Sequence, residues 1–173
     1  MPSFVNPKEI LSQLELRDSM VAVDFGCGSG GWVLPLAKKL EYGKVFAVDI
    51  QEESFSALKS KARMENISNI QTIQANLEEG VSQLNNSFFD LVLMANFLFQ
   101  VDKKEKVFQE AYRVLKKEGK LLVVDWKENS SLASVGEKVP SGKVKELAEN
   151  QGFSFEKELE AGDYHYALLF VKE

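Results

Sequence analysis

The sequence contains few of the residues on which several common functions depend. Its 173 residues include a single cysteine, Cys27, and a single histidine, His165. One cysteine forms no intramolecular disulfide, and it cannot supply the thiolate cluster of a structural metal site. We therefore expect no bound metal.

Excess basic charge and long apolar runs are also missing. Lys and Arg total 21 against 26 Asp and Glu, a net charge of −5, which argues against a standing basic face for DNA or RNA. The longest apolar run, residues 88–101, is broken by Asp90, Asn96 and Gln100, and residues 1–10 show no signal-peptide pattern. These features predict a cytoplasmic enzyme or binding domain without a DNA partner or stable membrane insertion.

The order of the elements indicates one α/β domain over 1–173, with an N-terminal helical arm at 1–19 and a core at 20–173. Its length and hydrophobic content of 45% suit a single core. Apolar runs alternate with stretches of helical spacing, which predicts a mostly parallel sheet, and the final two strands form an antiparallel hairpin. A polar loop is expected over 127–140. The predicted strands are 21–25, 44–50, 70–75, 88–95, 120–126, 153–159 and 164–172, and the predicted helices are 7–17, 32–40, 51–65, 77–84, 103–117 and 141–151.

One stretch organises the rest of the chain. Residues 21–32 read Val-Ala-Val-Asp-Phe-Gly-Cys-Gly-Ser-Gly-Gly-Trp, a short apolar strand followed by glycines at alternate positions and the start of a helix. Glycines let the backbone lie bare against a ligand, and a helix start favours an anionic group. Gly26, Gly28 and Gly31 also satisfy the dinucleotide pattern G-x-G-x-x-G, with Asp49 at a suitable distance. From this pattern alone, binding of a nicotinamide dinucleotide stays open.

The segment Asp-x-Gly-Cys-Gly-Ser-Gly at 24–30 resembles the first motif of the class I methyltransferases that use S-adenosylmethionine (AdoMet). The resemblance covers roughly residues 21–126, and the terminal hairpin is similar to the end of that family's sheet. It implies an α/β, Rossmann-like, doubly wound seven-stranded sheet, mostly parallel with one antiparallel C-terminal strand and helices on both faces. It also implies methyl transfer from AdoMet to an acceptor by in-line displacement, with S-adenosylhomocysteine as the product.

In an open α/β sheet, ligands bind beyond the carboxyl ends of the parallel strands, and this rule selects the cofactor residues. The glycine turn suits the AdoMet carboxylate, and Asp24 is expected to face the ammonium and sulfonium. Asp49 is expected to accept from both ribose hydroxyls, Ile50 to pack on the adenine, and Asn76 to accept from its amino group, where the family often has Asp. Asp24, Asp49 and Asn76 also have a simpler interpretation as turn-capping residues. The predicted cofactor set is Asp24, Gly26, Cys27, Gly28, Gly30, Asp49, Ile50, Asn76, Leu77, Ala95 and Asn96.

The acceptor pocket is predicted beside the ends of the fourth and fifth strands. Because the sixth strand runs toward the cofactor edge, the turn at Gly162 lies there and the seventh strand starts beside it. His165 would then either deprotonate or hydrogen-bond an acceptor, or pack as an edge residue. The predicted pocket consists of Phe97, Trp126, Lys127, Tyr164 and Tyr166, with His165 as the candidate catalytic residue.

The class of acceptor is suggested by the end of the fourth strand. Residues 94–100 read Met-Ala-Asn-Phe-Leu-Phe-Gln and lack the Asn-Pro-Pro-Tyr signature of amide and adenine N-methyltransferases. They resemble the small-molecule branch, which includes quinone-biosynthesis and arsenite enzymes, and the single cysteine argues against arsenite. We expect a small-molecule acceptor. The alternatives are a protein (lysine) or RNA methyltransferase on the same fold, or a non-catalytic module that binds AdoMet or a dinucleotide.

Overall fold

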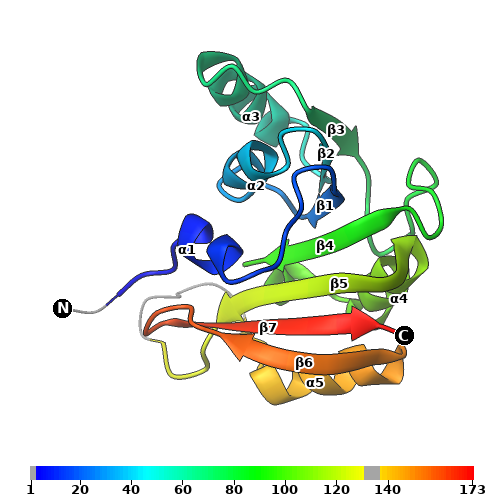
Figure 1. Ribbon diagram of the computed structural model, residues 1–173. Helices are drawn as coiled ribbons and strands as arrows, with labels where there is room; N and C mark the ends of the chain where they lie inside the picture. Colours follow the sequence, from blue (N-terminus) through cyan, green and yellow to red (C-terminus); the bar gives the residue numbers. More distant parts are fainter. Residues whose placement is uncertain (1–2, 131–136) are drawn as a thin grey trace.

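The computed structural model describes residues 3–130 and 137–173, in which strands and helices alternate along the chain (Figure 1). Of the predicted loop 127–140, residues 131–136 therefore lie outside the described residues. The helices are α1 (Pro7–Ser12), α2 (Val33–Lys39), α3 (Glu53–Met64), the 3-10 turn η1 (Leu98–Gln100), α4 (Lys104–Val114) and α5 (Ser141–Asn150). The strands are β1 (Val21–Phe25), β2 (Lys44–Asp49), β3 (Ile70–Gln74), β4 (Phe89–Ala95), β5 (Leu115–Trp126), β6 (Phe153–Leu159) and β7 (His165–Lys172).

The strands form one sheet in the order β3-β2-β1-β4-β5-β7-β6. Neighbouring strands from β3 to β5 are parallel, whereas β7 is antiparallel to both β5 and β6. The predicted doubly wound sheet with an antiparallel C-terminal strand is confirmed. The strand order reverses between β1 and β4, and such a switch point leaves a crevice at the carboxyl ends of the strands.

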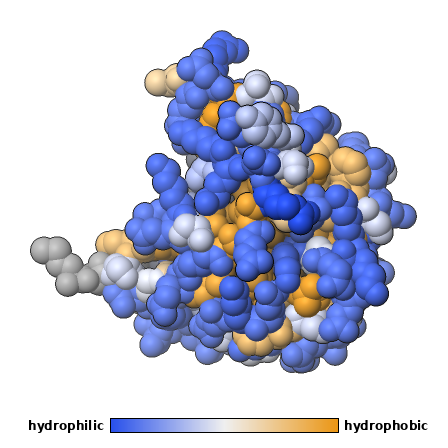
Figure 2. All heavy atoms as spheres, in the orientation of Figure 1, coloured by the Kyte–Doolittle hydropathy of each residue, from blue (hydrophilic) through white to orange (hydrophobic). Residues whose placement is uncertain are grey.

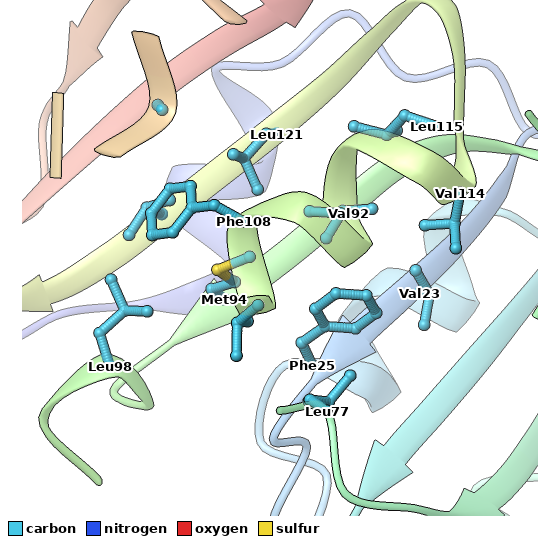
Figure 3. Packing of buried hydrophobic residues seen from close by; sticks show 14 of the residues in the cluster. Val23, Phe25, Leu77, Val92, Met94, Leu98, Phe108, Val114, Leu115 and Leu121 are labelled. Atoms are coloured by element: carbon cyan, nitrogen blue, oxygen red, sulfur yellow. The ribbon is translucent and has the colours of Figure 1, made fainter. Parts of the chain in front are cut away.

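Two apolar cores fill the space between the sheet and its helices. Along β1, Ala22 faces α1, α2 and α3, while Val23 and Phe25 face α4 and α5, because successive side chains point to opposite faces. Figure 3 shows Phe25, Met94 and Phe108 in the core on the side of α4 and α5, between β1, β4 and α4. The central strands are therefore apolar on both faces, as strands covered by helices on both sides must be.

Polar side chains cover most of the face shown in Figure 2, and apolar side chains are visible near the middle of the view and in smaller patches around it. The helices turn their apolar residues toward the sheet, as α2 does with Val33, Leu36 and Ala37. Across residues 3–130 and 137–173, none of the helices is long and apolar enough to cross a membrane.

The first helix, α1, is capped as predicted but is shorter than expected. The Asn6 side chain accepts a hydrogen bond from the Lys8 N–H at 3.1 Å, and Pro7 occupies the first helical position. The helix ends at Ser12, whereas the apolar spacing predicts an end near Arg17. Its buried residues, Ile10 and Leu11, belong to the core beneath α2.

The N-terminal arm is hydrogen-bonded to the turn between β6 and β7. The Gln13 side chain donates to the carbonyl oxygen of Glu160 at 3.0 Å and accepts from the Glu160 N–H at 3.0 Å. Ser3 donates its N–H to the Asp163 carboxylate at 2.6 Å, and its carbonyl oxygen accepts the Asp163 N–H at 3.0 Å. The N-terminal arm thus meets the β6–β7 turn, whereas the C-terminus lies at the far end of β7 (Figure 1).

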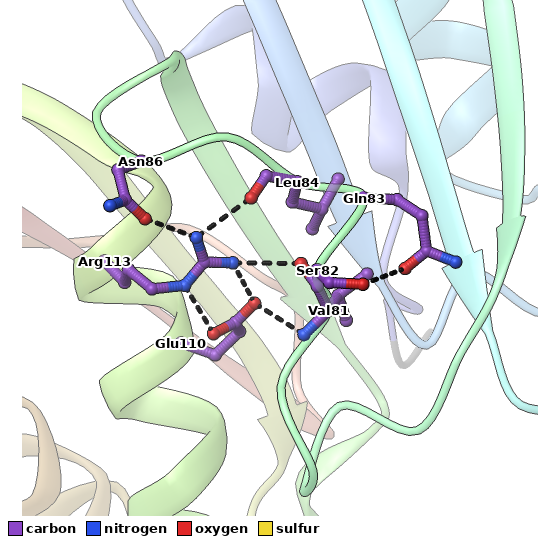
Figure 4. Close-up of polar contacts among 7 residues, drawn as sticks. All are labelled: Val81, Ser82, Gln83, Leu84, Asn86, Glu110 and Arg113. Atoms are coloured by element: carbon purple, nitrogen blue, oxygen red, sulfur yellow. Dashed lines mark hydrogen bonds and ion pairs between the residues drawn. The ribbon is translucent and has the colours of Figure 1, made fainter.

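The helix predicted over 77–84 is wrong, because this segment runs as a series of turns (Figure 4). Arg113 of α4 donates to the carbonyl oxygens of Val81 at 3.0 Å and Leu84 at 2.9 Å, and Glu110 accepts the Val81 N–H at 2.9 Å. A helix over 77–84 would pair the Val81 N–H with the Leu77 carbonyl oxygen, but in the structure Glu110 accepts it instead. Local apolar spacing cannot reveal these hydrogen bonds, because the partners lie on a distant helix.

The predicted boundary between the helix at 103–117 and the strand from 120 is also wrong. The strand β5 begins at Leu115, which pairs with Phe89 of β4 before the register shifts and Lys120 pairs with Leu91. The extra residues form a bulge, in which Glu118 has a φ of +64°. Pairing with β4 therefore overrides the helical spacing at the end of α4.

Candidate functional site

A cavity of about 410 Å³ lies at the carboxyl ends of β1, β2, β3 and β4, at the switch point of the sheet. Its lining includes every predicted cofactor residue except Asp24 and Gly30, and it also includes Phe97, which the sequence analysis assigned to the acceptor pocket. Four of the residues that sequence reasoning missed directly follow a predicted position, and the other four lie within four residues of one, so extending each strand end by a few residues would have found them. They are Ser29, Gly31, Gln51, Ser54, Ala75, Glu78, Gln100 and Val101.

The glycine turn presents bare backbone to this cavity and uses several of its N–H groups internally. Its alternate glycines have φ angles of +73°, +50° and +90°, which side-chain-bearing residues rarely adopt. The N–H groups of Gly26 and Cys27 both donate to the Val48 carbonyl oxygen, at 2.9 and 3.0 Å. The Gly28 N–H donates to the Asp49 carboxylate at 2.9 Å. These bonds tie the end of β1 to the end of β2 and fix the shape of the turn.

The three glycines are required for different reasons. A Cβ atom on Gly26 would lie 2.2 Å from the Phe97 ring, and one on Gly30 would lie 2.4 Å from Leu58. A Cβ on Gly28 would meet no atom within 4 Å and would project into open space. The protein itself therefore packs against Gly26 and Gly30, whereas Gly28 leaves room that a ligand can occupy.

Asp49 holds its carboxylate at the junction of β2 and the glycine turn. One oxygen accepts the Gly28 N–H at 2.9 Å, and the other accepts the Gln51 N–H at 2.9 Å. Each oxygen can accept a further hydrogen bond, because an ionised carboxylate offers about four lone-pair sites. The next residue, Ile50, lines the cavity and is 60% exposed, an unusual position for a large apolar side chain.

Asn76 lines the cavity after β3, next to the end of β2, where the Ala75 N–H donates to the Asp49 carbonyl oxygen at 3.0 Å. Its side-chain oxygen accepts the Glu78 N–H at 3.0 Å, which is the turn-capping role considered from the sequence. An amide oxygen has a second lone pair, so this bond leaves Asn76 able to accept from a ligand in the cavity.

Asp24 is buried beneath the turn, close to Asp49. Its Oδ1 has no hydrogen-bond partner among the described residues. Burial raises the pKa of Asp24 well above its usual range, and the nearby Asp49 raises it further. Burial also raises the pKa of the Cys27 thiol, which keeps it protonated and makes it a packing residue rather than a nucleophile. Across the described residues, no three His, Cys, Asp or Glu side chains lie close enough together to hold a metal ion.

The β4 side of the cavity is formed by residues 96–101, which we call the wall segment. Asn96 has a φ of +50°, and its buried Oδ1 has no partner in the described part of the chain. Phe97 follows it and packs on Gly26, and the segment continues as the short turn η1. The left-handed backbone at Asn96 ends the path of β4 and leads the chain into η1 beside the cavity.

His165 and Trp126 face each other where β5 ends and β7 begins, as predicted from the hairpin. They are direct register partners, with ring centroids 4.0 Å apart. His165 is buried, and neither ring nitrogen has a hydrogen-bond partner within the residues described. Burial and the nearby Lys127 lower its pKa to about 4. The imidazole is therefore neutral around neutral pH, and it does not line the 410 Å³ cavity.

The remaining predicted acceptor residues lie along the same edge of the sheet, outside the cavity lining. The Lys127 ammonium donates to the Gly162 carbonyl oxygen at 3.1 Å, and Tyr164 packs on Phe4 with ring centroids 5.4 Å apart. The Tyr166 hydroxyl donates to the Val139 carbonyl oxygen at 2.7 Å. The structure thus brings Trp126, Lys127 and Tyr164 together at this edge, while Tyr166 points into the core on the other face of the sheet.

Comparison with known proteins places this fold and site in a family. The sequence matches the methyltransferase domain family over residues 16–167. The chain belongs to this family, and its sheet order and glycine motif are those of the class I AdoMet-dependent methyltransferases. The interpretation of residues 24–30 as a methyltransferase motif is confirmed.

The chain is similar to enzymes named for quinone biosynthesis. It is 26% identical over 119 residues to a demethylmenaquinone methyltransferase from Oceanobacillus iheyensis. The aligned region covers 68% of this chain and 49% of that protein. It is 31% identical over 113 residues to the ubiquinone/menaquinone biosynthesis C-methyltransferase UbiE from Escherichia fergusonii, covering 64% and 44%. The chain thus spans about half the length of these relatives.

A solved structure shares nearly the whole fold. The crystal structure of a SAM-dependent methyltransferase from Aquifex aeolicus superposes with a TM-score of 0.89 at 24% identity, covering 98% of this chain and 91% of that one. This likeness supports the fold and its strand order.

Proposed function

We propose that this chain transfers a methyl group from AdoMet to a small-molecule acceptor and releases S-adenosylhomocysteine. The observation that carries the proposal is the open space over Gly28, with the Asp49 carboxylate bonded beside it at 2.9 Å. Bare backbone next to a fixed carboxylate suits a ligand with a sugar diol, and the family to which the chain belongs transfers methyl groups.

The buried oxygens of the site fit a positively charged cofactor. Asp24 Oδ1 and Asn96 Oδ1 are both buried and without a hydrogen-bond partner among the described residues. A buried polar atom without a partner is unfavourable, and a nearby cation would stabilise both oxygens and lower the raised pKa of Asp24. When bound, AdoMet supplies an ammonium group and a sulfonium whose methyl group is the electrophile.

The other cofactor groups would be held by residues around the cavity. Asp49 would accept from the ribose hydroxyls with the lone pairs that its two backbone hydrogen bonds leave free. Ile50 would cover one face of the adenine, which gives its exposed side chain an apolar partner. Asn76 would accept from the adenine amino group. None of these interactions requires a metal.

The acceptor would lie next to Phe97 and toward the ends of β4 and β5. Methyl transfer needs alignment and exclusion of water more than a strong base. His165 is neutral and its nitrogens are buried, so it would act as a hydrogen-bonding partner if the acceptor reaches it. Trp126, Lys127, Tyr164 and Tyr166 remain predicted acceptor residues.

A quinol-like ring is the acceptor class that we favour. Two of the relatives are named for quinone biosynthesis, and this matches the small-molecule interpretation of residues 94–100. The net charge of −5 disfavours RNA, and we place the reaction in the cytoplasm, without a DNA partner.

Calorimetry and a methyl-transfer assay test this proposal. The protein should bind AdoMet and S-adenosylhomocysteine, and it should bind NADH weakly or not at all. Transfer of labelled methyl groups should then be measured with hydroquinones, a lysine-rich protein and RNA as separate acceptors. Transfer to the hydroquinones supports the proposal, transfer only to protein or RNA replaces the acceptor class, and binding of NADH without AdoMet refutes it.

A further inference from the structure

Asp125 is a buried carboxylate that lies outside the cavity and is bonded to its wall. It stands near the end of β5 and is 1% exposed. Its Oδ2 accepts the N–H of Leu98 at 3.2 Å, and its Oδ1 accepts the N–H of Trp126 at 2.8 Å. Because Asp125 does not line the cavity, any effect it has on a ligand must pass through the groups that it holds.

The Leu98 N–H belongs to the wall segment, residues 96–101. At its two ends, the Asn96 N–H donates to the Val124 carbonyl oxygen at 2.8 Å and the Val101 carbonyl oxygen accepts the Lys104 ammonium at 2.5 Å. The side chains of Leu98 and Val101 are buried in the core. The bond from Leu98 to Asp125 joins the middle of the segment to β5. It holds the backbone directly after the left-handed residue Asn96, where the chain has no regular strand partner to define its path.

Phe97 connects the wall segment with the glycine turn through direct packing. Its ring lies so close to Gly26 that even a Cβ there would come within 2.2 Å of it. A shift of the Leu98 backbone would move the adjacent Phe97, and this would change both the cavity wall and the packing on the first glycine of the turn. The structure thus contains a continuous path from Asp125 through Leu98 and Phe97 to Gly26.

We propose that Asp125 is a positioning residue for the cofactor site, whose carboxylate fixes the wall segment through the Leu98 N–H and so seats Phe97 against Gly26. The proposal rests on the proposed function only for the identity of the ligand. Its effect on the wall segment is a property of the chain itself and can be measured without a ligand.

Ionisation of Asp125 should control this contact. A protonated carboxyl has one O–H donor and fewer acceptor sites, so it cannot accept both backbone N–H groups equally well. Burial raises the pKa of Asp125 to about 6, against the opposing effects of its backbone hydrogen bonds and of Lys104 at the start of α4. Tyr166, its register partner on β7, stays neutral because burial raises its own pKa, and Asp125 and Glu128 raise it further. The turn η1, Leu98–Gln100, contributes no titratable group.

The test compares Asp125→Asn with a matched control, Asp90→Asn. Asp125→Asn replaces one acceptor oxygen by an NH₂ group with little change in volume. Asp90 also accepts a backbone N–H, that of Val21 at 2.8 Å, but it lies at the start of β4, at the opposite edge of the sheet. Both variants weaken a bond to a backbone N–H, and only the bond of Asp125 touches the wall segment. Asp90 also accepts the Lys116 ammonium at 2.8 Å, so Asp90→Asn perturbs its own site at least as much as Asp125→Asn does.

Two measurements read the result. Hydrogen exchange without ligand should show faster exchange across residues 96–101 in Asp125→Asn and unchanged exchange there in Asp90→Asn. Calorimetry near pH 7.5 should show AdoMet binding weakened about tenfold in Asp125→Asn and unchanged within about twofold in Asp90→Asn. The AdoMet affinity of the wild type should fall as the pH drops through about 6, and this fall should be absent in Asp125→Asn. A pH dependence of affinity that comes from Asp24 should remain in both proteins.

The outcomes separate this inference from the proposed function. If the wild type and Asp90→Asn bind AdoMet and Asp125→Asn binds it equally well, the positioning role is refuted and the proposed function stands. If no variant binds AdoMet, the proposed function fails, and exchange in residues 96–101 still decides the role of Asp125. Should Asp125→Asn prove too unstable, the wild-type wall segment gives the answer through its protection, which is the exchange rate divided into the intrinsic rate of an unfolded chain at the same pH. Protection that does not fall between about pH 7 and 5 overturns the proposal.

Discussion

The carboxylate of Asp49 accepts the N–H of Gly28 at 2.9 Å and so joins the ends of β2 and β1. One side chain therefore both shapes the glycine turn and faces the cavity. In the proposed function the same carboxylate also receives the ribose hydroxyls. We therefore expect cofactor affinity to be sensitive to substitution of Asp49.

Asp49→Ala should weaken AdoMet binding by at least about tenfold. A hydrogen bond to a charged group contributes about 1.5–3 kcal/mol, and the substitution also frees the Gly28 N–H and loosens the turn. Calorimetry measures the effect. Asp18→Ala, which removes an exposed carboxylate from the turn before β1, is the control and should bind like the wild type. Equal affinity in all three proteins would show that Asp49 does not hold the cofactor.

Gly28→Ala and Gly26→Ala should separate ligand binding from folding. At Gly28 the new methyl group meets no protein atom, so stability should fall only by the roughly 1–2 kcal/mol of a left-handed alanine, while AdoMet affinity falls sharply. At Gly26 the methyl group would overlap the Phe97 ring, so the loss of stability should be clearly larger. Chemical denaturation and calorimetry on both variants check this. Normal AdoMet binding by a folded Gly28→Ala protein would mean that the ligand does not lie over this glycine.

His165→Phe should stabilise the protein, and more so at acid pH. The pKa of His165 is lowered to about 4, so between about pH 4 and 6.5 the unfolded chain binds more protons than the folded one and wild-type stability rises with pH. Phenylalanine keeps the packing on Trp126 and removes both unpaired nitrogens. We expect a gain of roughly 2 kcal/mol near pH 5 and a smaller gain near pH 8, measured by thermal unfolding.

The same variant decides whether His165 takes part in the reaction. If it hydrogen-bonds the acceptor, His165→Phe will lose turnover while AdoMet affinity stays unchanged. Undiminished turnover in the more stable protein assigns His165 to structure, and methyl transfer then depends on alignment alone.

Arg113→Ala should destabilise the protein by about 2–4 kcal/mol. It leaves the buried Glu110 carboxylate without its ionic partner and the carbonyl oxygens of Val81 and Leu84 without their donor (Figure 4). Denaturant unfolding gives the measurement. Lys143→Ala breaks an exposed ion pair with Glu146 on α5 and should change stability little. A similarly small effect for Arg113→Ala would show that the turns over 77–84 do not depend on the hydrogen bonds of Arg113.

The sequence is sufficient to predict most of the sheet and much of the cavity lining, because both depend on local patterns. Apolar runs such as Phe89–Ala95 mark central strands, and glycines at alternate positions mark the turn. The rule that ligands bind at strand ends then brings Asp49, Asn76 and Asn96 together without knowledge of their distances.

The features that sequence reasoning missed depend on partners distant in the chain. Arg113 and Glu110 determine the path of residues 77–84 through hydrogen bonds to their backbone. Leu115 belongs to β5 because it pairs with Phe89 of β4. The bond between Asp125 and Leu98 is of the same kind, since no local pattern around Asp125 indicates which backbone it holds. Apolar spacing describes how one segment buries its own side chains, and it contains no information on such pairings.

The place of β7 inside the sheet has a consequence for synthesis on the ribosome. Among the described residues, β6 is hydrogen-bonded to the sheet only through β7. The side chain of Gln13 is hydrogen-bonded to Glu160, which lies at the turn between β6 and β7. Residues 153–159 of β6 therefore leave the ribosome before β7, their only partner strand. They stay without a partner strand until residues 165–172 have been synthesised. The residues that line the cavity, by contrast, have all left the exit tunnel once residue 101 has, but the wall segment then still lacks its bonds to Val124 and Asp125. The cofactor residues are thus made first, and β5 and β7, which fix the wall segment and form the acceptor edge, are made later.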